Sequence, residues 1–184
     1  MNVGATTETE AGLYFAWGET QGYADASTKA YNWNGYVLTD DSGSTMSKYT
    51  GVSGDGLTHL ELSDDAASVN MGGDWHMPNK AQFNELLNTE YVTNTWVTDY
   101  QGSSINGRLF TSVSNGNTLF IPAAGYCANS EVYGVGNIYY VWTSALYSEN
   151  VKNALCFYSY NSDAGRDLSL NRYYGNPVRG VVGN

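Results

Sequence analysis

Two motifs bracket the C-terminal part of the chain, Tyr140-Val141-Trp142-Thr143-Ser144 and Gly175-Asn176-Pro177-Val178-Arg179-Gly180-Val181. Between them, residues from about 147 to 174 include five tyrosines together with Ser, Asn and Asp. Tyrosine supplies a large amphipathic contact area at low entropic cost, and Ser and Asn supply adaptable hydrogen bonds, as in antibody paratopes. This stretch, which we call the variable segment, therefore predicts a recognition surface carried on a scaffold and not a reaction centre.

The composition favours one domain that spans residues 1–184. A chain of 184 residues, 42% of them hydrophobic, is long enough to bury a substantial core. Charged residues make up only 14%, and 21 glycines indicate many turns. The polar surface must then consist mainly of Asn, Ser, Thr and Tyr, a composition that suits loop-rich extracellular domains.

The charge balance excludes some classes of partner. Eight Lys and Arg against 18 Asp and Glu give a net charge of −10. They cannot form the broad basic face that binds nucleic acid phosphates or anionic membranes. No apolar run approaches the roughly 20 residues of a membrane span. The start, Met1-Asn2-Val3-Gly4, resembles a truncated entry into a domain, so we expect a monomeric domain of a larger exported protein whose export signal was removed.

Two helices are predicted in the first half of the chain. The stretch Ser63-Asp64-Asp65-Ala66-Ala67-Ser68-Val69 begins with a capping serine and has two acids in its first turn, and Gly72-Gly73 ends it. The second helix covers 78–87. Its predicted N-cap is Asn79, and Gln82 three residues later completes a capping box.

The later part of the chain is typical of strands and turns. Asn115-Gly116 between two apolar runs is a strong hairpin signal. The predicted strands are 13–17, 108–113, 118–121, 138–144, 154–158 and 177–182. Two early helices and a late antiparallel sheet predict an α+β domain with long loops.

Other polar and reactive residues are expected to be structural. Cys127 and Cys156 leave two alternatives open, a disulfide and two buried thiols. Arg108 and Arg179 lie beside apolar residues, which predicts buried fold anchors paired with a carboxylate or a backbone carbonyl. The only histidines, His59 and His76, are isolated in the sequence and are expected to have structural roles.

Catalysis and cofactors are not expected. The sequence has no nucleophile elbow, no HExxH, no phosphate-binding loop and no metal-spaced Cys/His cluster, so we predict a protein that is not an enzyme and has no catalytic or metal site. No cofactor is expected. A structural calcium ion in the oxygen-rich long loops stays open as an alternative.

Seven landmarks in order carry a family resemblance that covers nearly the whole chain. They are Asn2-Val3-Gly4-Ala5-Thr6, Tyr14-Phe15-Ala16-Trp17-Gly18-Glu19, Gly72-Gly73-Asp74-Trp75-His76-Met77-Pro78, Asn106-Gly107-Arg108-Leu109-Phe110, Phe120-Ile121-Pro122-Ala123-Ala124-Gly125-Tyr126 and the two bracketing motifs. Each is weak alone, but the ordered set resembles the surface domains of Bacteroidota known as Fibrobacter succinogenes major paralogous domains. The resemblance implies a C-type lectin fold of the formylglycine-generating-enzyme branch, with two helices, a twisted antiparallel sheet and long loops.

Several such domains are variable proteins of diversity-generating retroelements, which rewrite adenines in one C-terminal gene segment. The usual target codon, AAC, can become a codon for most residue types but never for Trp, Lys, Glu, Gln or Met. Trp142, Glu149 and Lys152 are therefore expected to be framework. The candidate ligand-binding residues, all reachable from AAC, are Tyr147, Ser148, Val151, Asn153, Cys156, Tyr158, Tyr160, Ser162, Asp163, Leu168, Leu170, Arg172, Tyr173 and Tyr174.

The sequence thus predicts a ligand-binding protein displayed on a cell surface or a phage particle, with a protein or glycan partner on another cell or surface. Two alternatives stay open. One is a glycan-binding adhesin of fixed specificity, which could stack a sugar on Trp33 or Trp17. The other is a structural subunit of a pilus or cell envelope that packs through the variable segment.

Overall fold

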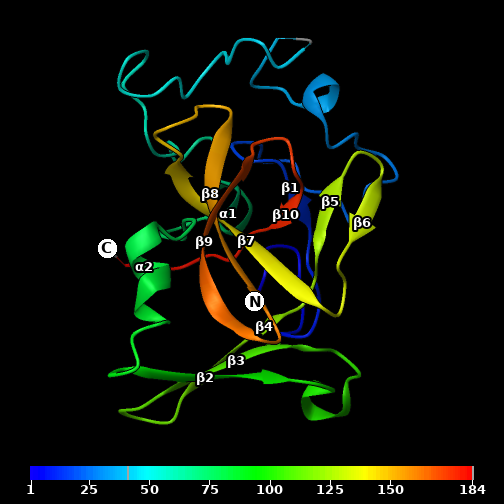
Figure 1. Ribbon diagram of the computed structural model, residues 1–184, viewed down its shortest axis with the longest axis vertical. Helices are drawn as coiled ribbons and strands as arrows, with labels where there is room; N and C mark the ends of the chain where they lie inside the picture. Colours follow the sequence, from blue (N-terminus) through cyan, green and yellow to red (C-terminus); the bar gives the residue numbers. More distant parts are fainter. Residues whose placement is uncertain (41, 184) are drawn as a thin grey trace.

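Most of the regular structure consists of four small antiparallel sheets. The computed structural model describes residues 1–40 and 42–183 (Figure 1). The sheets are β1 (Tyr14–Phe15) with β10 (Asn176–Pro177); β2 (Val92–Val97), β3 (Gly107–Ser112) and β4 (Thr118–Pro122); β5 (Tyr126–Ala128) with β6 (Glu131–Tyr133); and β7 (Ile138–Leu146), β8 (Asn153–Tyr160) and β9 (Asp163–Asn171). The helices are α1 (Ala66–Met71), α2 (Lys80–Glu85) and two short 3-10 turns, η1 (Trp33–Gly35) and η2 (Tyr100–Gly102).

The prediction of an α+β domain with a C-type lectin fold is wrong. Strands account for 35% of the chain and helices for only 10%. The two α-helices have six residues each, too few to form a layer over a sheet. The strands are also divided among separate small sheets and do not form one twisted sheet. The fold is mostly β.

The helix predictions differ in their outcome. α2 begins as expected, because Asn79 accepts a hydrogen bond from the Gln82 backbone and the Gln82 side chain accepts one from the Asn79 backbone. The predicted Ser63 cap of α1 is wrong. Asp65 caps that helix, since its carboxylate accepts hydrogen bonds from the backbone N–H groups of Ser68 and Met77. The Asp65 carboxylate therefore caps the N-terminus of α1 and also holds the backbone at Met77, which follows the helix.

The strand predictions succeed where the pattern is local. The hairpin around Asn115-Gly116 forms between β3 and β4, and Gly116 adopts a positive φ of 74°. β7 and β8 lie where expected. The predicted strand 177–182 is mostly wrong, because only Pro177 belongs to a strand. β2 and the nine-residue β9 were not predicted, and β9 occupies much of the variable segment.

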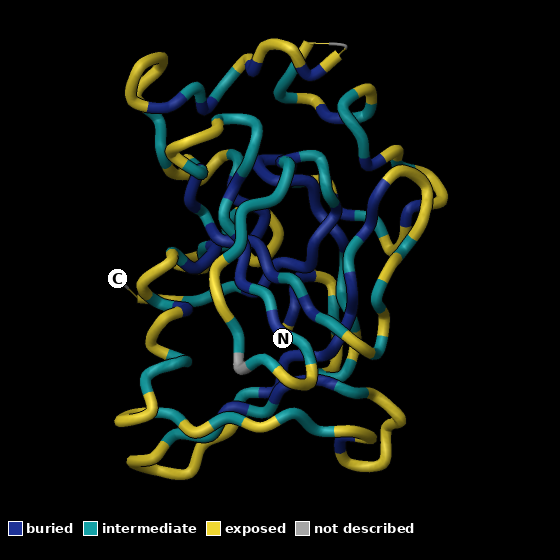
Figure 2. Tube along the Cα trace, viewed as in Figure 1, coloured by how far each residue is buried: buried dark blue, intermediate teal, exposed yellow. Residues whose placement is uncertain are grey.

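The sheet of β7, β8 and β9 has two covered faces. Neighbouring residues on a strand point to opposite faces. Trp142 and Cys156, which pair across β7 and β8, belong to the main core with Trp17. Phe157 points the other way and stacks on Phe83 of α2, with ring centroids 4.6 Å apart. Figure 2 shows the buried residues concentrated at the centre of the molecule, while exposed residues line the long upper loop and the outer hairpins.

A buried arginine joins distant parts of the chain. Arg172, directly after β9, is fully buried. Its guanidinium donates to the backbone carbonyls of Lys48, Tyr49 and Val151 at 3.0 to 3.3 Å and to the Tyr36 hydroxyl at 2.8 Å. The rings of Trp17, Tyr36 and Tyr49 surround it at 4.9 to 5.8 Å. A guanidinium carries five N–H donors, and this site uses most of them.

An ion pair and a hydrogen bond hold the end of the long loop between β1 and α1 in place. The Asp64 carboxylate accepts hydrogen bonds from the Lys48 ammonium and the Tyr49 hydroxyl, both at 2.6 Å. Partial burial raises the pKa of Asp64, but these hydrogen bonds outweigh burial and hold the pKa below its ordinary value. The folded protein therefore favours the ionised carboxylate.

No helix within residues 1–40 or 42–183 has the length and apolar character needed to cross a membrane.

We predict that Arg172→Met lowers the free energy of unfolding by about 3 kcal/mol or more, because it leaves buried carbonyls without donors. Urea unfolding followed by tryptophan fluorescence measures the loss. Arg166→Met, the same change at an exposed arginine on β9, is the matched control and should cost less than about 1 kcal/mol. Equal effects of the two substitutions would contradict the structural role of Arg172.

We predict that acid weakens the fold partly through Asp64. A carboxyl whose pKa is depressed by folding contributes stability above its unfolded pKa, about 3.9, and loses this contribution as the pH falls through its folded pKa. Asp64→Asn should therefore be less stable than the parent at pH 7 but lose less stability on acidification. Urea unfolding at pH 7 and at pH 3 tests this, with the exposed Asp74→Asn as control. An unchanged pH dependence in Asp64→Asn would contradict it.

Candidate functional site

Eight aromatic side chains form a continuous strip, which we call the aromatic strip. Its members are Trp33, Tyr126, Tyr133, Tyr140, Tyr158, Tyr160, Tyr173 and Tyr174. Tyr133 is 39% exposed and the other seven are half-buried. A core residue would be covered on every side, so these rings lie at the boundary between the core and solvent.

Neighbouring rings in the strip touch one another. From Trp33 the contacts run through Tyr173, Tyr174, Tyr126, Tyr140 and Tyr158 to Tyr160, with successive ring centroids 4.8, 4.7, 5.7, 5.1, 5.0 and 5.6 Å apart. Tyr133 branches from Tyr126 at 5.6 Å. These spacings are those of favourable aromatic pairs. The strip is therefore a connected surface and not a scatter of single rings.

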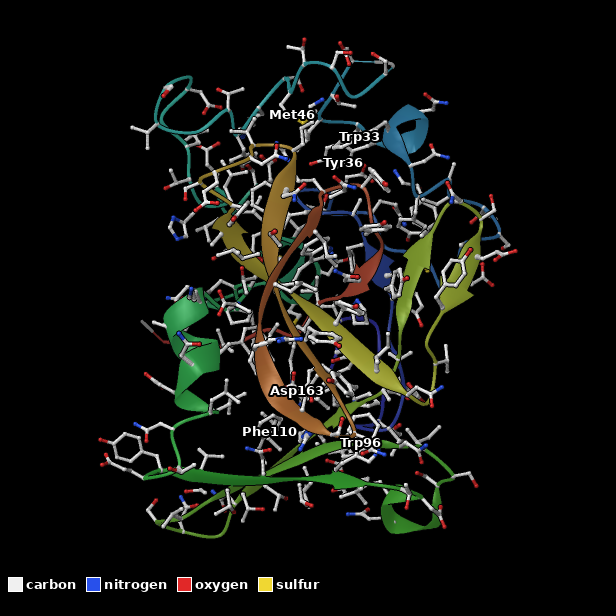
Figure 3. All side chains as sticks on the ribbon, viewed as in Figure 1. Trp33, Tyr36, Met46, Trp96, Phe110 and Asp163 are labelled. Carbon is white, nitrogen blue, oxygen red and sulfur yellow. The ribbon has the colours of Figure 1, made fainter. Side chains whose placement is uncertain are left out.

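Strand pairing brings together strip residues that lie far apart in the chain. Tyr140 on β7 lies directly opposite Tyr158 on β8, and Tyr126 on β5 lies opposite Tyr133 on β6. Backbone hydrogen bonds between Cys127 and Gly175 then bring the Tyr173 and Tyr174 turn beside β5. Trp33 comes from the long N-terminal loop, which Figure 3 shows at the top of the molecule with Trp33, Tyr36 and Met46 close together.

The strip has a rigid backing and neutral hydroxyl groups. Tyr140 and Tyr174 pack against the main core. Burial raises the pKa of Tyr140 above its ordinary value and that of Tyr174 to about 12. Both hydroxyls are therefore uncharged at neutral pH and can donate as well as accept hydrogen bonds.

One end of the strip carries charge and a shallow hollow. The Arg166 guanidinium lies 5.7 Å from the centre of the Tyr158 ring and 3.4 Å from the Asp163 carboxylate. Tyr158 and Tyr160 also line an open hollow of about 610 Å³ with Ile138, Asn161 and Ser162. This end can offer an aromatic face together with both signs of charge.

Arg108 holds the turn at that end in place. Its buried guanidinium donates to the carbonyls of Tyr160 and Asp163 and to the side chains of Ser159 and Asn94. Figure 3 shows Asp163 in the same region as Trp96, whose ring lies 5.6 Å from the Arg108 guanidinium. The prediction that Arg108 is a fold anchor paired with backbone carbonyls is confirmed. Its hydrogen bonds hold the turn between β8 and β9 in place.

The predicted ligand-binding residues divide into three groups. Four belong to the strip: Tyr158, Tyr160, Tyr173 and Tyr174. Ser148 and Ser162 are exposed, and Tyr147, Val151, Asn153, Asp163, Leu168 and Leu170 are half-buried. Cys156 and Arg172 are fully buried. Neither of these two side chains can touch a ligand in this structure.

The strand geometry explains this division. Cys156 lies between Trp142 and Leu168 across three strands, so its side chain points into the core. Leu168 and Leu170 pack at the edge of the same core. Ser148 and Val151 line a different hollow, near Gly51 and Leu146. The variable segment is therefore partly core, partly strip and partly a separate loop.

Sequence reasoning missed Tyr126, Tyr133 and Tyr140 as members of the surface. They lie outside the variable segment and join it only through strand pairing, for which no local sequence signal exists. Among the sequence predictions, Trp33 enters only as a sugar platform in the adhesin alternative. Trp17, the other candidate platform, is fully buried and donates its indole N–H to the Thr143 carbonyl at 2.8 Å.

The remaining candidates are structural. Cys127 and Cys156 are both buried free thiols, so the disulfide alternative is wrong. Burial raises the pKa of Cys127 to about 12. Across the described part of the chain, no three His, Cys, Asp or Glu side chains gather as metal ligands would.

Comparisons with known proteins leave the family open: no family model, no curated protein and no solved structure matches the chain.

Proposed function

We propose that the protein binds a macromolecular ligand through the aromatic strip. The observation that carries the proposal is the chain of ring contacts from Trp33 to Tyr160 at the solvent boundary. Tyrosine and tryptophan dominate binding hot spots because they bury much area with few rotatable bonds. Rings that already pack on one another and on the core lose little further freedom when a ligand binds, which reduces the entropic cost.

The ligand in this proposal is a protein or a glycan on another cell or surface, and the protein is displayed on a bacterial cell or a phage particle. Aromatic faces stack on sugar rings and also pack on apolar side chains, while tyrosine hydroxyls supply hydrogen bonds to either. The net charge of −10 disfavours nucleic acid as the ligand. The strip contributes surface chemistry only, and catalysis forms no part of the proposal.

We further propose that the chain is the variable protein of a diversity-generating retroelement. Six positions in the variable segment are reachable from AAC and are exposed or half-buried: Tyr147, Ser148, Tyr158, Tyr160, Ser162 and Tyr173. Substitution of these side chains would change which ligand the protein binds and would leave the strands in place. Arg172 and Cys156 would stay constant in every folded variant.

A second candidate is an adhesin of fixed specificity. It is favoured by the three strip residues outside the variable segment, Tyr126, Tyr133 and Tyr140. It is also favoured by Arg172, a buried anchor inside the segment whose random replacement would unfold many copies. In this candidate the whole strip is one evolved site, and its sequence is the same in all members of a population.

The experiment that separates the two candidates is deep sequencing of this gene segment in a growing population of its source. The retroelement proposal predicts substitutions confined to AAC-type codons, with the six positions varied and codons 156 and 172 unchanged among variants that fold. A uniform segment would remove that proposal and leave the adhesin of fixed specificity.

We predict that Tyr158→Ala combined with Tyr173→Ala reduces binding of the labelled protein to a glycan array or to intact bacterial cells by about tenfold or more, because the strip loses two hot-spot rings. The matched control is Tyr91→Ala, which removes a tyrosine that is 61% exposed and lies outside the strip. Thermal unfolding should still be cooperative in both variants. Unchanged binding by the double variant would overturn the role of the strip.

A further inference from the structure

A third buried arginine, Arg179, lies beside an apolar hollow at α2. Arg179 is only 9% exposed, and it follows β10 in the closing segment of the chain. The hollow has a volume of about 170 Å³ and lies between α2, β4 and this closing segment. Figure 1 shows the C-terminal segment running to α2, away from β5 and β6, which carry part of the aromatic strip. We call the hollow the Arg179 pocket.

The wall of the Arg179 pocket is apolar apart from the arginine and the polar end of Gln82. Its apolar side chains are Phe83, Leu86, Leu119, Ile121 and Val181. Phe83 and Ile121 are buried core residues, so that part of the wall is rigid. The pocket is therefore a preformed apolar cavity with Arg179 in its wall, an arrangement typical of small-ligand sites.

The guanidinium of Arg179 is poorly satisfied by the protein. Of its five N–H donors, one group is engaged: Nη1 donates to the Phe120 carbonyl at 3.0 Å. This bond confirms the prediction that Arg179 pairs with a backbone carbonyl. None of the ion pairs in residues 1–40 and 42–183 includes Arg179. Glu8 acts on Arg179 only through space, and its carboxylate accepts a hydrogen bond from the Tyr100 hydroxyl at 3.1 Å.

A mostly buried charge without an ion-pair partner is costly. Transfer of an ion from water into a low-dielectric site is unfavourable unless an opposite charge and hydrogen bonds replace the lost hydration. Burial accordingly lowers the pKa of Arg179 to about 10, which still leaves it cationic at neutral pH. A carboxylate in the pocket would supply the missing partner, and its two oxygens match the fork of a guanidinium.

We propose that the Arg179 pocket binds a small monocarboxylate with a short apolar chain. The carboxylate pairs with the guanidinium of Arg179, and the chain packs against Leu86, Leu119 and Val181. The small volume excludes long fatty chains, and the apolar wall disfavours ligands with a second charge. This site is independent of the aromatic strip, because Phe83 and Tyr158 lie against opposite faces of the sheet of β7, β8 and β9.

The test is a titration of the whole domain with 3-methylbutanoate, followed by two-dimensional ¹H–¹⁵N NMR. The amide signals of Leu119, Gly180 and Val181 should shift in a saturable manner. The uncharged isostere 3-methylbutanamide should bind about tenfold more weakly or worse, because it cannot form a charge-assisted pair with the guanidinium. Equal shifts with acid and amide, or no saturable shift with the acid, would overturn the proposal.

Two variants test the pocket from different sides. Arg179→Lys keeps the charge and loses the fork, and Leu86→Trp fills the cavity without altering the charge. Each should weaken 3-methylbutanoate binding by about tenfold. If Arg179→Lys fails to fold, Leu86→Trp decides alone, since Leu86 is half-buried at the end of α2.

Matched controls separate this site from non-specific binding and from the proposed function. Arg166→Lys makes the same change at an exposed arginine and should bind 3-methylbutanoate as the parent does. The double variant Tyr158→Ala and Tyr173→Ala should also bind the carboxylate unchanged. Loss of carboxylate binding in either control, or unchanged binding in Leu86→Trp, would contradict the assignment to the Arg179 pocket.

Discussion

The fold depends on one buried cation. Arg172 lies where the C-terminal segment leaves β9 and enters the core, and its guanidinium bonds to carbonyls at Lys48, Tyr49 and Val151. The Arg172 carbonyl in turn accepts a hydrogen bond from the Trp17 backbone. Four small sheets do not by themselves constrain one another, because each has only two or three strands. Long-range hydrogen bonds of Arg172 join the N-terminal segment, the long loop and the sheet of β7, β8 and β9.

The aromatic strip follows from that constraint. The long loop must lie against the end of the last sheet to reach Arg172, and this places Trp33 beside Tyr173. The strip then continues across β5, β7 and β8 on one face of the sheet, while Phe157 and Tyr139 on the other face pack against Phe83 and Phe110. The partly exposed rings pack on a rigid interior, so recognition and stability depend on different parts of the molecule.

Three buried arginines perform different tasks because their surroundings differ. Arg172 and Arg108 each donate to several acceptors, so both act as structural anchors. Arg179 has one acceptor and lines an apolar cavity. Guanidinium groups carry the same five donors in all three cases. The number of acceptors that the protein offers each guanidinium decides its role. A guanidinium with several acceptors anchors the fold, and one with a single acceptor keeps N–H donors free for a ligand.

The sequence by itself determined the local features: the capping box of Asn79 and Gln82, the hairpin at Asn115-Gly116, and the two apolar strands that became β7 and β8. It also identified Arg108 and Arg179 as buried arginines that pair with backbone carbonyls. Each of these depends on residues close together in the chain or on a charge beside apolar neighbours. Roughly half of the aromatic strip, the tyrosines at 158, 160, 173 and 174, was likewise visible in the sequence because it lies within one tyrosine-rich segment.

Only the tertiary structure decided the rest. β9 has a polar and irregular sequence, and it becomes a strand because β8 supplies its hydrogen-bond partners. The burial of Cys156 and Arg172, and the union of Tyr126, Tyr133 and Tyr140 with the strip, depend on pairing between residues far apart in the chain. The α+β prediction failed for the same reason. Helix caps are local signals, but whether helices or sheets dominate a domain depends on long-range packing.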